Sequence, residues 1–177
     1  MGSNEVVAFS TLNGVPAHRF GKGEGSTICS FFNGEATPAN HLSWPKGVVV
    51  HRGSVYVADT GHHTVKVFSR SGQLRTCWGR RGSADGEFEF PTGIGALGEH
   101  IFVSEHVGRR VQAFTLEGKF VAKVSVPGSG ELMGLSVDKN HVYIVDDDEH
   151  CVWRLDRTGP CGLIEEHSMM RTWRVGA

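Results

Sequence analysis

The sequence predicts an all-β protein built from repeated, four-stranded antiparallel sheets. Three observations predict this: many glycines, many short strand-like segments and an internal repeat. The chain has 177 residues, enough for one domain with a sizeable core, and 24 of them are glycine, roughly twice the usual share of about 7%. Glycine at this density, mixed with valine and phenylalanine, indicates short strands joined by tight turns.

The internal repeat becomes visible when residues 45–78 are aligned with residues 91–124, a shift of 46. A second shift, of 41 residues, extends the match to residues 134–159. Neither alignment needs an internal gap, so we interpret the three copies as one repeated structural unit. The coinciding positions include Pro45 with Pro91, Gly47 with Gly93 and Gly134, Val55-Tyr56-Val57 with Ile101-Phe102-Val103 and Val142-Tyr143-Ile144, and Gly72 with Gly118 and Gly159.

Each unit is predicted to form four short strands. In the first unit these are Gly47–Val50, Val55–Ala58, Val65–Ser69 and a fourth strand that follows Ser71-Gly72 and reaches Trp78. The second strand is apolar on both faces, which favours a sheet covered on both sides. Four antiparallel strands that recur about every 40–45 residues are typical of a β-propeller blade.

The chain is expected to be a single propeller domain over residues 1–177. It contains three full repeats and an N-terminal half repeat, in which Val6–Phe9 and Phe20-Gly21 match the third strand and the end of the fourth. The predicted segments are a half repeat at 6–25, a loop insertion at 26–41, repeats at 42–86, 87–130 and 131–164, and a tail at 165–177.

These residues resemble a known family, the NHL repeat, as it occurs in the NHL domains of TRIM–NHL-type proteins. The resemblance is carried by Pro91-Thr92-Gly93-Ile94, Val55–Gly61, Val65–Phe68 and Trp78-Gly79 with Gly86-Glu87-Phe88. It implies a radial ring, in this family usually of six blades. Two organisations are open: a piece of a larger propeller, or a four-bladed ring in which a C-terminal strand starting near residue 172 pairs with the half repeat. An open arc would expose sheet edges and a blade face, which favours self-association.

Three carboxylates occupy one position of the repeat: Asp59, Glu105 and Asp146. Each directly follows the second strand. A catalytic acid is expected once, whereas a carboxylate in every repeat is better explained by structure. We therefore expect these side chains to accept hydrogen bonds from backbone N–H groups.

The turn after each carboxylate carries basic residues, and these are the candidate binding residues. By the repeat alignment they project from the same end of the ring and would form a mildly basic rim for a protein partner or for RNA. RNA-reading NHL domains are thought to use such a rim, so the resemblance supports this hypothesis. The rim candidates are His62, His63, Lys66, Arg109, Arg110 and His150.

No motif for a metal or cofactor is present. The four cysteines have no C-x-x-C spacing, no H-E-x-x-H occurs, and Asp146-Asp147-Asp148-Glu149 lacks the spacing of a calcium loop. The metal-binding histidine and the tyrosine that a resemblance to the amidating lyases would require are also missing. The sequence therefore predicts no cofactor and no enzyme, but a binding or scaffold module that presents its blade-connecting loops. The alternatives are the substrate-recognition part of a ubiquitin ligase and a degenerate lyase- or lactonase-like enzyme.

Charge and hydropathy add little about partners. The formal net charge is −1, so no overall field attracts nucleic acid or anionic membranes. Residues 1–25 lack the features of a secretory signal, and no apolar run is long enough to span a membrane. The sequence thus predicts a cytoplasmic protein with reduced thiols and no membrane partner.

Overall fold

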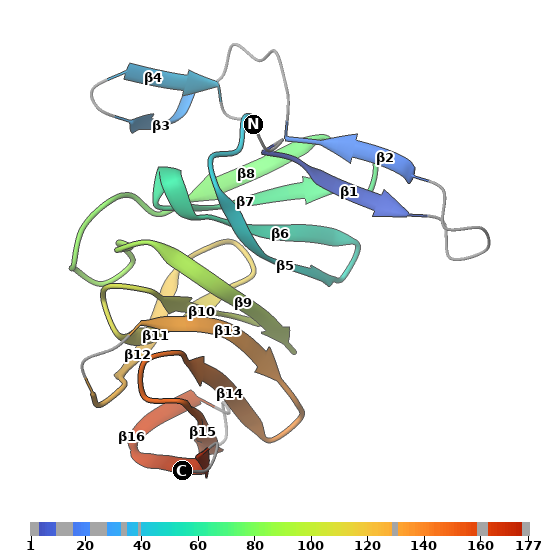
Figure 1. The fold of residues 1–177 in the computed structure, drawn as a ribbon. Coiled ribbons are helices and arrows are strands. Elements are labelled where there is room, and N and C mark those ends of the chain that lie inside the picture. The colour runs from blue at the N-terminus through green and yellow to red at the C-terminus, as the bar shows by residue number, and fades with distance from the viewer. Residues whose placement is uncertain are drawn as a thin grey trace.

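The computed structural model describes residues 4–9, 16–21, 28–32, 35–38, 40–128, 131–158 and 163–174. In this part of the chain, three four-stranded antiparallel sheets stand side by side as the blades of a propeller arc (Figure 1). Their inner strands, β5 (Pro45–His51), β9 (Pro91–Leu97) and β13 (Leu132–Val137), are in contact in that order. The predicted all-β propeller fold is therefore confirmed.

The blades follow the order of the sequence, and the strands of each blade pair with their sequence neighbours. Blade 1 consists of β5, β6 (Ser54–Asp59), β7 (Thr64–Ser69) and β8 (Leu74–Trp78), with a short 3-10 turn, η1 (Thr60–His62), between β6 and β7. Blade 2 consists of β9, β10 (His100–Glu105), β11 (Arg110–Thr115) and β12 (Phe120–Ser125). Blade 3 consists of β13, β14 (His141–Asp146), β15 (Cys151–Thr158) and β16 (Leu163–Arg174).

The N-terminal strands β1 (Val6–Phe9) and β2 (Pro16–Phe20) form a half blade. Val6 pairs with Phe20, just as Val65 pairs with Trp78 in blade 1. The half blade therefore corresponds to the third and fourth strands of a complete blade. The predicted loop insertion at 26–41 instead contains a two-stranded sheet of β3 (Ile28–Phe32) and β4 (Glu35–Pro38).

The C-terminal strand β16 pairs antiparallel with β15 and completes blade 3. In the four-bladed alternative a new first strand would start near residue 172, but residues 172–174 belong to this fourth strand because Val152 and Cys151 pair with Trp173 and Arg174. Within the described ranges β16 pairs only with β15, and β1 only with β2. The hybrid blade of the four-bladed alternative is not formed there.

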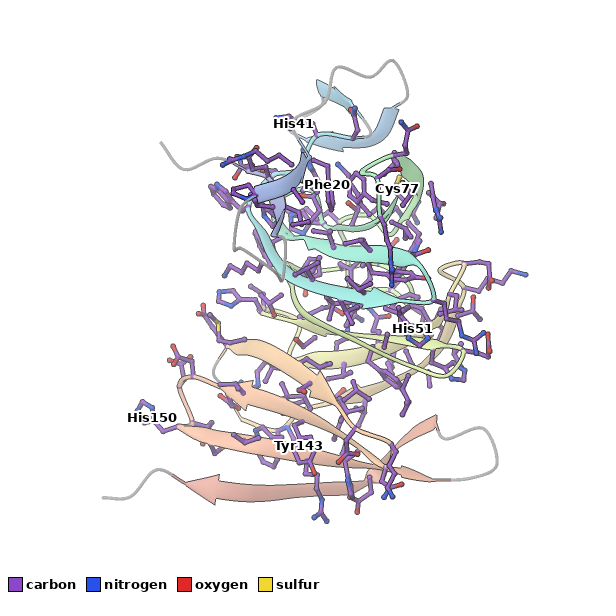
Figure 2. The ribbon with its side chains drawn as sticks, turned by 90° about the vertical axis from the view of Figure 1, so that its right-hand side faces the viewer. Phe20, His41, His51, Cys77, Tyr143 and His150 are labelled. Carbon is purple, nitrogen blue, oxygen red and sulfur yellow. The ribbon has the colours of Figure 1, made fainter. Side chains whose placement is uncertain are left out.

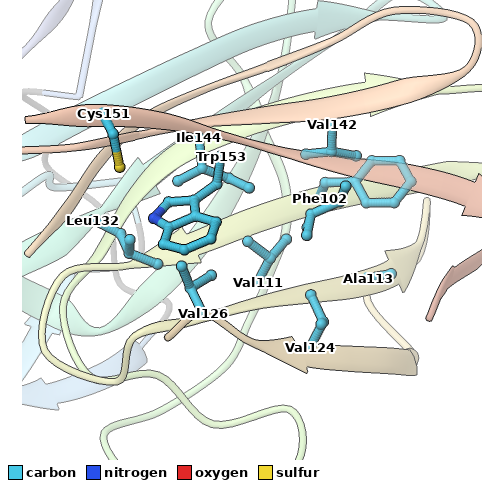
Figure 3. Packing of buried hydrophobic residues seen from close by; sticks show 11 residues of the cluster. Phe102, Val111, Ala113, Val124, Val126, Leu132, Val142, Ile144, Cys151 and Trp153 are labelled. Carbon is cyan, nitrogen blue, oxygen red and sulfur yellow. The ribbon is translucent and has the colours of Figure 1, made fainter. Parts of the chain in front are cut away.

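Apolar side chains from neighbouring blades make three buried clusters. Val57 and Phe68 of blade 1 pack against Phe20 of the half blade. Tyr56 and Val67, on the other face of blade 1, pack against blade 2. The largest cluster lies between blades 2 and 3 (Figure 3), and consists of Phe102, Val111, Ala113, Val124, Val126, Leu132, Val142, Ile144, Cys151, Trp153 and Leu155.

Because blades 1 and 2 are covered on both sides, their middle strands are buried along almost their whole length. All six residues of β6 are buried, as are five of the six residues of β7. Blade 3 differs, since buried residues of β14 alternate with partly or fully exposed ones, as expected for a sheet with one uncovered face. Burial on both faces explains why the second strands of blades 1 and 2 are so apolar.

The turns of the blades define two faces of the arc. The loop face carries the turns that follow β6, β10 and β14, together with the blade-connecting segments 79–90 and 126–128. The opposite face carries the turns at residues 52–53, 70–73, 98–99, 116–119 and 138–140. Figure 2 shows His150 on the loop face and His51 near the opposite face.

The cysteines correct one expectation of the sequence analysis. Cys77 is disulfide-bonded, whereas reduced thiols were expected. The thiol of Cys151 is buried between blades 2 and 3. Among the described residues, no helix has the length and apolar character needed to cross a membrane.

Candidate functional site

The three repeat carboxylates lie at equivalent places on the loop face. Asp59, Glu105 and Asp146 each end the second strand of a blade and are almost completely buried. Each pairs with the first residue of its inner strand, so the carboxylate lies where the inner strand begins. Their burial and hydrogen bonds agree with the structural role expected for them.

Each carboxylate accepts a hydrogen bond from the side chain seven residues later. Lys66 Nζ lies 2.8 Å from Asp59 Oδ2, Gln112 Nε2 lies 2.7 Å from Glu105 Oε1, and Trp153 Nε1 lies 3.0 Å from Asp146 Oδ2. Lysine, glutamine and tryptophan thus perform the same task in the three blades. Gln112 and Trp153 were missed in the sequence analysis. A signal was present, because each repeat has an N–H donor side chain seven residues after its carboxylate.

In blade 1 the carboxylate of Asp59 joins three other groups. It accepts from the backbone N–H of Ser43 at 2.6 Å and lies 2.7 Å from His62 Nδ1. Lys66 also donates to the carbonyl oxygen of His41. Burial lowers the pKa of Lys66, and the charge and hydrogen bond of Asp59 oppose this effect. The cluster ties the segment that enters blade 1 to strands β6 and β7.

In blade 2 the corresponding carboxylate binds an arginine. Arg110 Nε donates to Glu105 Oε1 at 2.6 Å, and the backbone N–H of Glu89 donates to Oε2 at 2.7 Å. Arg110 also donates to the carbonyl oxygens of Ser83 and Glu87 in the blade-connecting segment. One buried ion pair therefore fixes the loop that runs from blade 1 to blade 2.

In blade 3 the cation comes from the neighbouring blade. Arg109 Nη2 donates to Asp146 Oδ2 at 2.8 Å and also to the carbonyl oxygen of Pro127. The backbone N–H of Glu149 donates to Asp146 Oδ1 at 3.2 Å. Burial acts to raise the pKa of Asp146, but the hydrogen bonds from Arg109, Trp153 and Glu149 outweigh it and lower this pKa below 3.8.

The lowered pKa of Asp146 predicts a loss of stability in acid. An unfolded Asp146 takes up its proton near pH 3.8, whereas the folded protein holds this carboxylate ionised to lower pH. The stabilisation is therefore complete above about pH 5 and is lost progressively as the pH falls through the folded pKa. Urea unfolding between pH 6 and pH 3 should show a shallower pH dependence for Asp146→Asn than for the wild type. An identical slope in both proteins would rule out this ionisation as a source of the acid sensitivity.

The structure separates the six rim candidates into two groups. His62, His63, Lys66 and Arg110 are buried, and Arg109 is mostly covered, with 13% of its side chain exposed. His150 is exposed and projects from blade 3 (Figure 2).

The buried candidates serve the blades themselves rather than an open surface. His63 Nδ1 accepts from the backbone N–H of Phe90 at 3.2 Å. The two rings contact each other at a tilt of 58°, with 4.4 Å between their centroids. Burial, together with the charge of Arg81, lowers the pKa of His63, so its imidazole is neutral at pH 7. The rim that the sequence predicts is therefore accessible mainly at His150.

The geometry of these networks defines what they can do chemically. Every carboxylate oxygen named above accepts a hydrogen bond from a donor of the protein, and the three carboxylates are buried. Within the described part of the chain, no group of three or more His, Cys, Asp or Glu side chains is placed to hold a metal ion. The carboxylates hold the segments that enter the blades in place.

Comparisons with known proteins agree with this architecture. A family model described as NHL repeat matches residues 42–68, which include β5, β6 and most of β7. The chain is 25% identical over 107 residues to Protein brain tumor of Drosophila melanogaster, an alignment that covers 58% of this chain and 10% of that protein.

Solved structures share the fold at low identity. A streptogramin B lyase structure superposes with a TM-score of 0.61 and 16% identity, covering 92% of this chain and 47% of that one. An inactive H270A virginiamycin B lyase from Staphylococcus aureus, determined with quinupristin, gives a TM-score of 0.59 and 13% identity and covers 97% and 57% of the two chains. The chain thus spans about half the length of these propellers. It contains an NHL repeat at residues 42–68 and has the fold of a β-propeller protein.

Proposed function

We propose that this chain is a protein-binding scaffold and that strand β5 contributes to its binding surface. The NHL similarity supports a binding role in general. The observation that carries the proposal is an exposed stripe on blade 1, which we call the β5 stripe and define as Trp44, Lys46, Val48 and Val50; three of its four side chains are apolar. Large exposed apolar patches are typical of protein–protein interaction sites.

The β5 stripe follows from the alternation of side chains along a strand. Alternate residues of β5 are exposed, so Lys46, Val48 and Val50 lie on the same face. Val48 is 53% exposed and Val50 56%, and Trp44, which directly precedes the strand, is 65% exposed. A pocket of about 240 Å³ between β1 and β5 adjoins the stripe and is lined in part by Val6, Lys46 and Val48. A large aromatic side chain beside exposed valines is the composition expected of an interface centre.

A single charge on the stripe tests the proposal. Val48→Lys should remove partner binding while leaving the fold intact, because Val48 is exposed and a lysine in the partner's apolar contact would be desolvated without a counter-charge. Affinity purification of the full chain after cross-linking in its source cells measures this. Val107→Lys is the matched control, since Val107 is an equally exposed valine, at 55%, on the loop face. Equal recovery of the same partners by wild type and Val48→Lys, with Tm unchanged, would refute the proposed role of the stripe.

The proposed function is binding without catalysis. The repeat carboxylates are engaged by protein donors, and a substrate would have to displace buried ion pairs to reach them. RNA binding depends on exposed cations, and burial of four of the six rim candidates disfavours it. Substrate recognition within a ubiquitin ligase would use the same kind of protein-binding surface. The disulfide of Cys77 favours an oxidising compartment over the cytoplasm expected from the sequence.

A further inference from the structure

An open cleft lies on the opposite face of the arc, between blades 1 and 2, and combines apolar walls from Val67 and Leu116 with several polar side chains. Its volume is about 410 Å³, within the range of sites that hold a small group or a side chain. Most of its walls come from blade 1, namely from strands β6 and β8 and from the β5–β6 turn. The β11–β12 turn of blade 2 forms the remaining wall. Its polar lining consists of Arg52, Ser54, Tyr56, Arg75, Thr76 and Glu117.

The internal repeat provides a comparison for this lining. Blade 2 presents the same five strand and turn positions at its boundary with blade 3. There, one guanidinium is replaced by glycine and the other by valine, and the tyrosine and threonine hydroxyls are lost. The equivalent pairs of blade 1 and blade 2 are Arg52 and Gly98, Ser54 and His100, Tyr56 and Phe102, Arg75 and Val121, and Thr76 and Ala122. The polar lining is thus specific to one blade boundary and is not required by the blade fold.

The donors of the cleft are held in place by one another. Arg75 Nη1 donates to Ser54 Oγ at 2.6 Å, and Ser54 is in turn hydrogen-bonded to the side chain of Tyr56. Burial raises the pKa of Tyr56, so its hydroxyl keeps its proton at neutral pH. Arg75 and Thr76 are exposed at the cleft mouth. The site therefore presents a fixed guanidinium beside hydroxyl groups, which suits an oxyanion.

The second guanidinium belongs to Arg52, a residue with an uncommon backbone conformation. Arg52 has φ 44° and the following Gly53 has φ 75°, the pattern of a tight hairpin turn that favours Asn-Gly. The equivalent residue of blade 2 is Gly98, with φ 60°. A non-glycine residue here is uncommon and strained. Arg52 Nη2 pairs with Glu99 at 2.5 Å, and both side chains are more than half exposed, so a ligand oxyanion can displace this carboxylate at small cost.

We propose that this cleft binds an oxyanion, a carboxylate or a phosphate, carried by a side chain of a protein partner. Arg75 and Arg52 contact the oxyanion, and Thr76 donates a further hydrogen bond. Glu117 is the one acidic residue of the lining, and Glu99 neutralises Arg52 at the edge of the cleft, so the two guanidiniums face the ligand together once the oxyanion has displaced Glu99. This inference rests on the proposed protein-binding function and adds a second contact, on a different face from the β5 stripe.

Peptide titration of the full chain tests this assignment by NMR. The probes are acetylated and amidated Gly-Gly-X-Gly-Gly peptides, in which X is glutamate, phosphoserine or glutamine, and inorganic phosphate as a fourth probe. We expect the glutamate or the phosphoserine peptide to shift the amide resonances of Thr76 and Glu117 saturably, and we expect no shift from the glutamine peptide. Whichever of the two binds tighter identifies the source of the oxyanion.

Matched variants separate the cleft from general charge effects. Arg75→Gln should weaken peptide binding by about tenfold or more, as expected for loss of a charge-assisted hydrogen bond. Arg70→Gln removes an exposed arginine of the same face outside the cleft and should leave the Kd unchanged. Arg52→Asn should weaken binding while raising Tm, because asparagine suits the turn, and a gain in Tm excludes unfolding as the cause.

Three results would overturn the inference: equal shifts from the glutamine peptide, unchanged binding in Arg75→Gln, or inorganic phosphate binding as tightly as the peptides. Val48→Lys should bind the peptides normally. If the peptides cause no shifts but Val48→Lys loses its protein partners, the oxyanion site is refuted and the proposed protein-binding function stands. If the peptides bind and Val48→Lys still recovers the same partners as the wild type, only the proposed role of the β5 stripe is refuted.

Discussion

Replacing Glu105 with glutamine is expected to lower the free energy of unfolding by about 3–5 kcal/mol, the range for breaking a buried ion pair. Glu105 is fully buried, and it accepts from Arg110, Gln112 and the backbone of Glu89. Glutamine removes the charge that balances Arg110 and adds an NH₂ group where every neighbour is a donor. Urea denaturation followed by tryptophan fluorescence measures the effect.

The same substitution on the surface provides the control. Glu99 also pairs with an arginine, but both side chains of that pair are more than half exposed, so Glu99→Gln should cost less than about 1 kcal/mol. If Glu105→Gln does not yield folded protein, Gln112→Met removes the hydrogen bonds of Gln112 to Glu105, Glu87 and Gly86 but keeps the ion pair with Arg110, and it should give a smaller, measurable loss. A cost for Glu105→Gln as small as that for Glu99→Gln would mean that the carboxylate does not hold the blade-connecting loop.

The strands could be predicted because their signals are local and repeated. Alternation and β-branched residues identify Val55–Ala58 and Val65–Ser69, and the structure extends these segments by only one or two residues. The repeat adds register, since a match between the half repeat and blade 1 at Val6 and Phe20 requires the pairing that is observed. Strand β16 was harder to predict because it has no close counterpart in the other repeats.

The site could be predicted only in part, because burial in a propeller depends on the neighbouring blade. Lys66 and Arg110 were placed on an accessible rim, since charged side chains are rarely buried unless paired. The sequence contains their partners, Asp59 and Glu105, but pairing across a turn is not a periodic signal. The cleft on the opposite face was also missed. Arg52 and Arg75 lie 23 positions apart in the chain and come together only when β5–β6 and β8 form one sheet.

The second large effect is expected at the inner strands, where Gly93→Ala should destabilise the protein by about 1–3 kcal/mol or more, as overpacking does. A Cβ atom on Gly93 would lie 2.5 Å from the backbone nitrogen of Leu135 and 2.5 Å from Ser104 Oγ. The serine hydroxyl can rotate away, but the backbone of β13 cannot yield without shifting blade 3. Thermal unfolding of Gly93→Ala should show a lower Tm with intact secondary structure at low temperature.

Gly134 is the matched control, because it occupies the same register in blade 3. The nearest atom to a Cβ added at Gly134 would be Val145 Cγ2 at 3.9 Å, so Gly134→Ala should be neutral or stabilise by about 0.4–1 kcal/mol through the unfolded chain. The comparison also probes the uncovered face of blade 3. Gly47 and Gly93 are glycine because the next inner strand lies against them, with Thr92 O and Leu135 N less than 3 Å from an added Cβ. If Gly134→Ala proves as costly as Gly93→Ala, β13 must be covered in solution in the way that β5 and β9 are, and the exposed face of blade 3 is then an occupied interface.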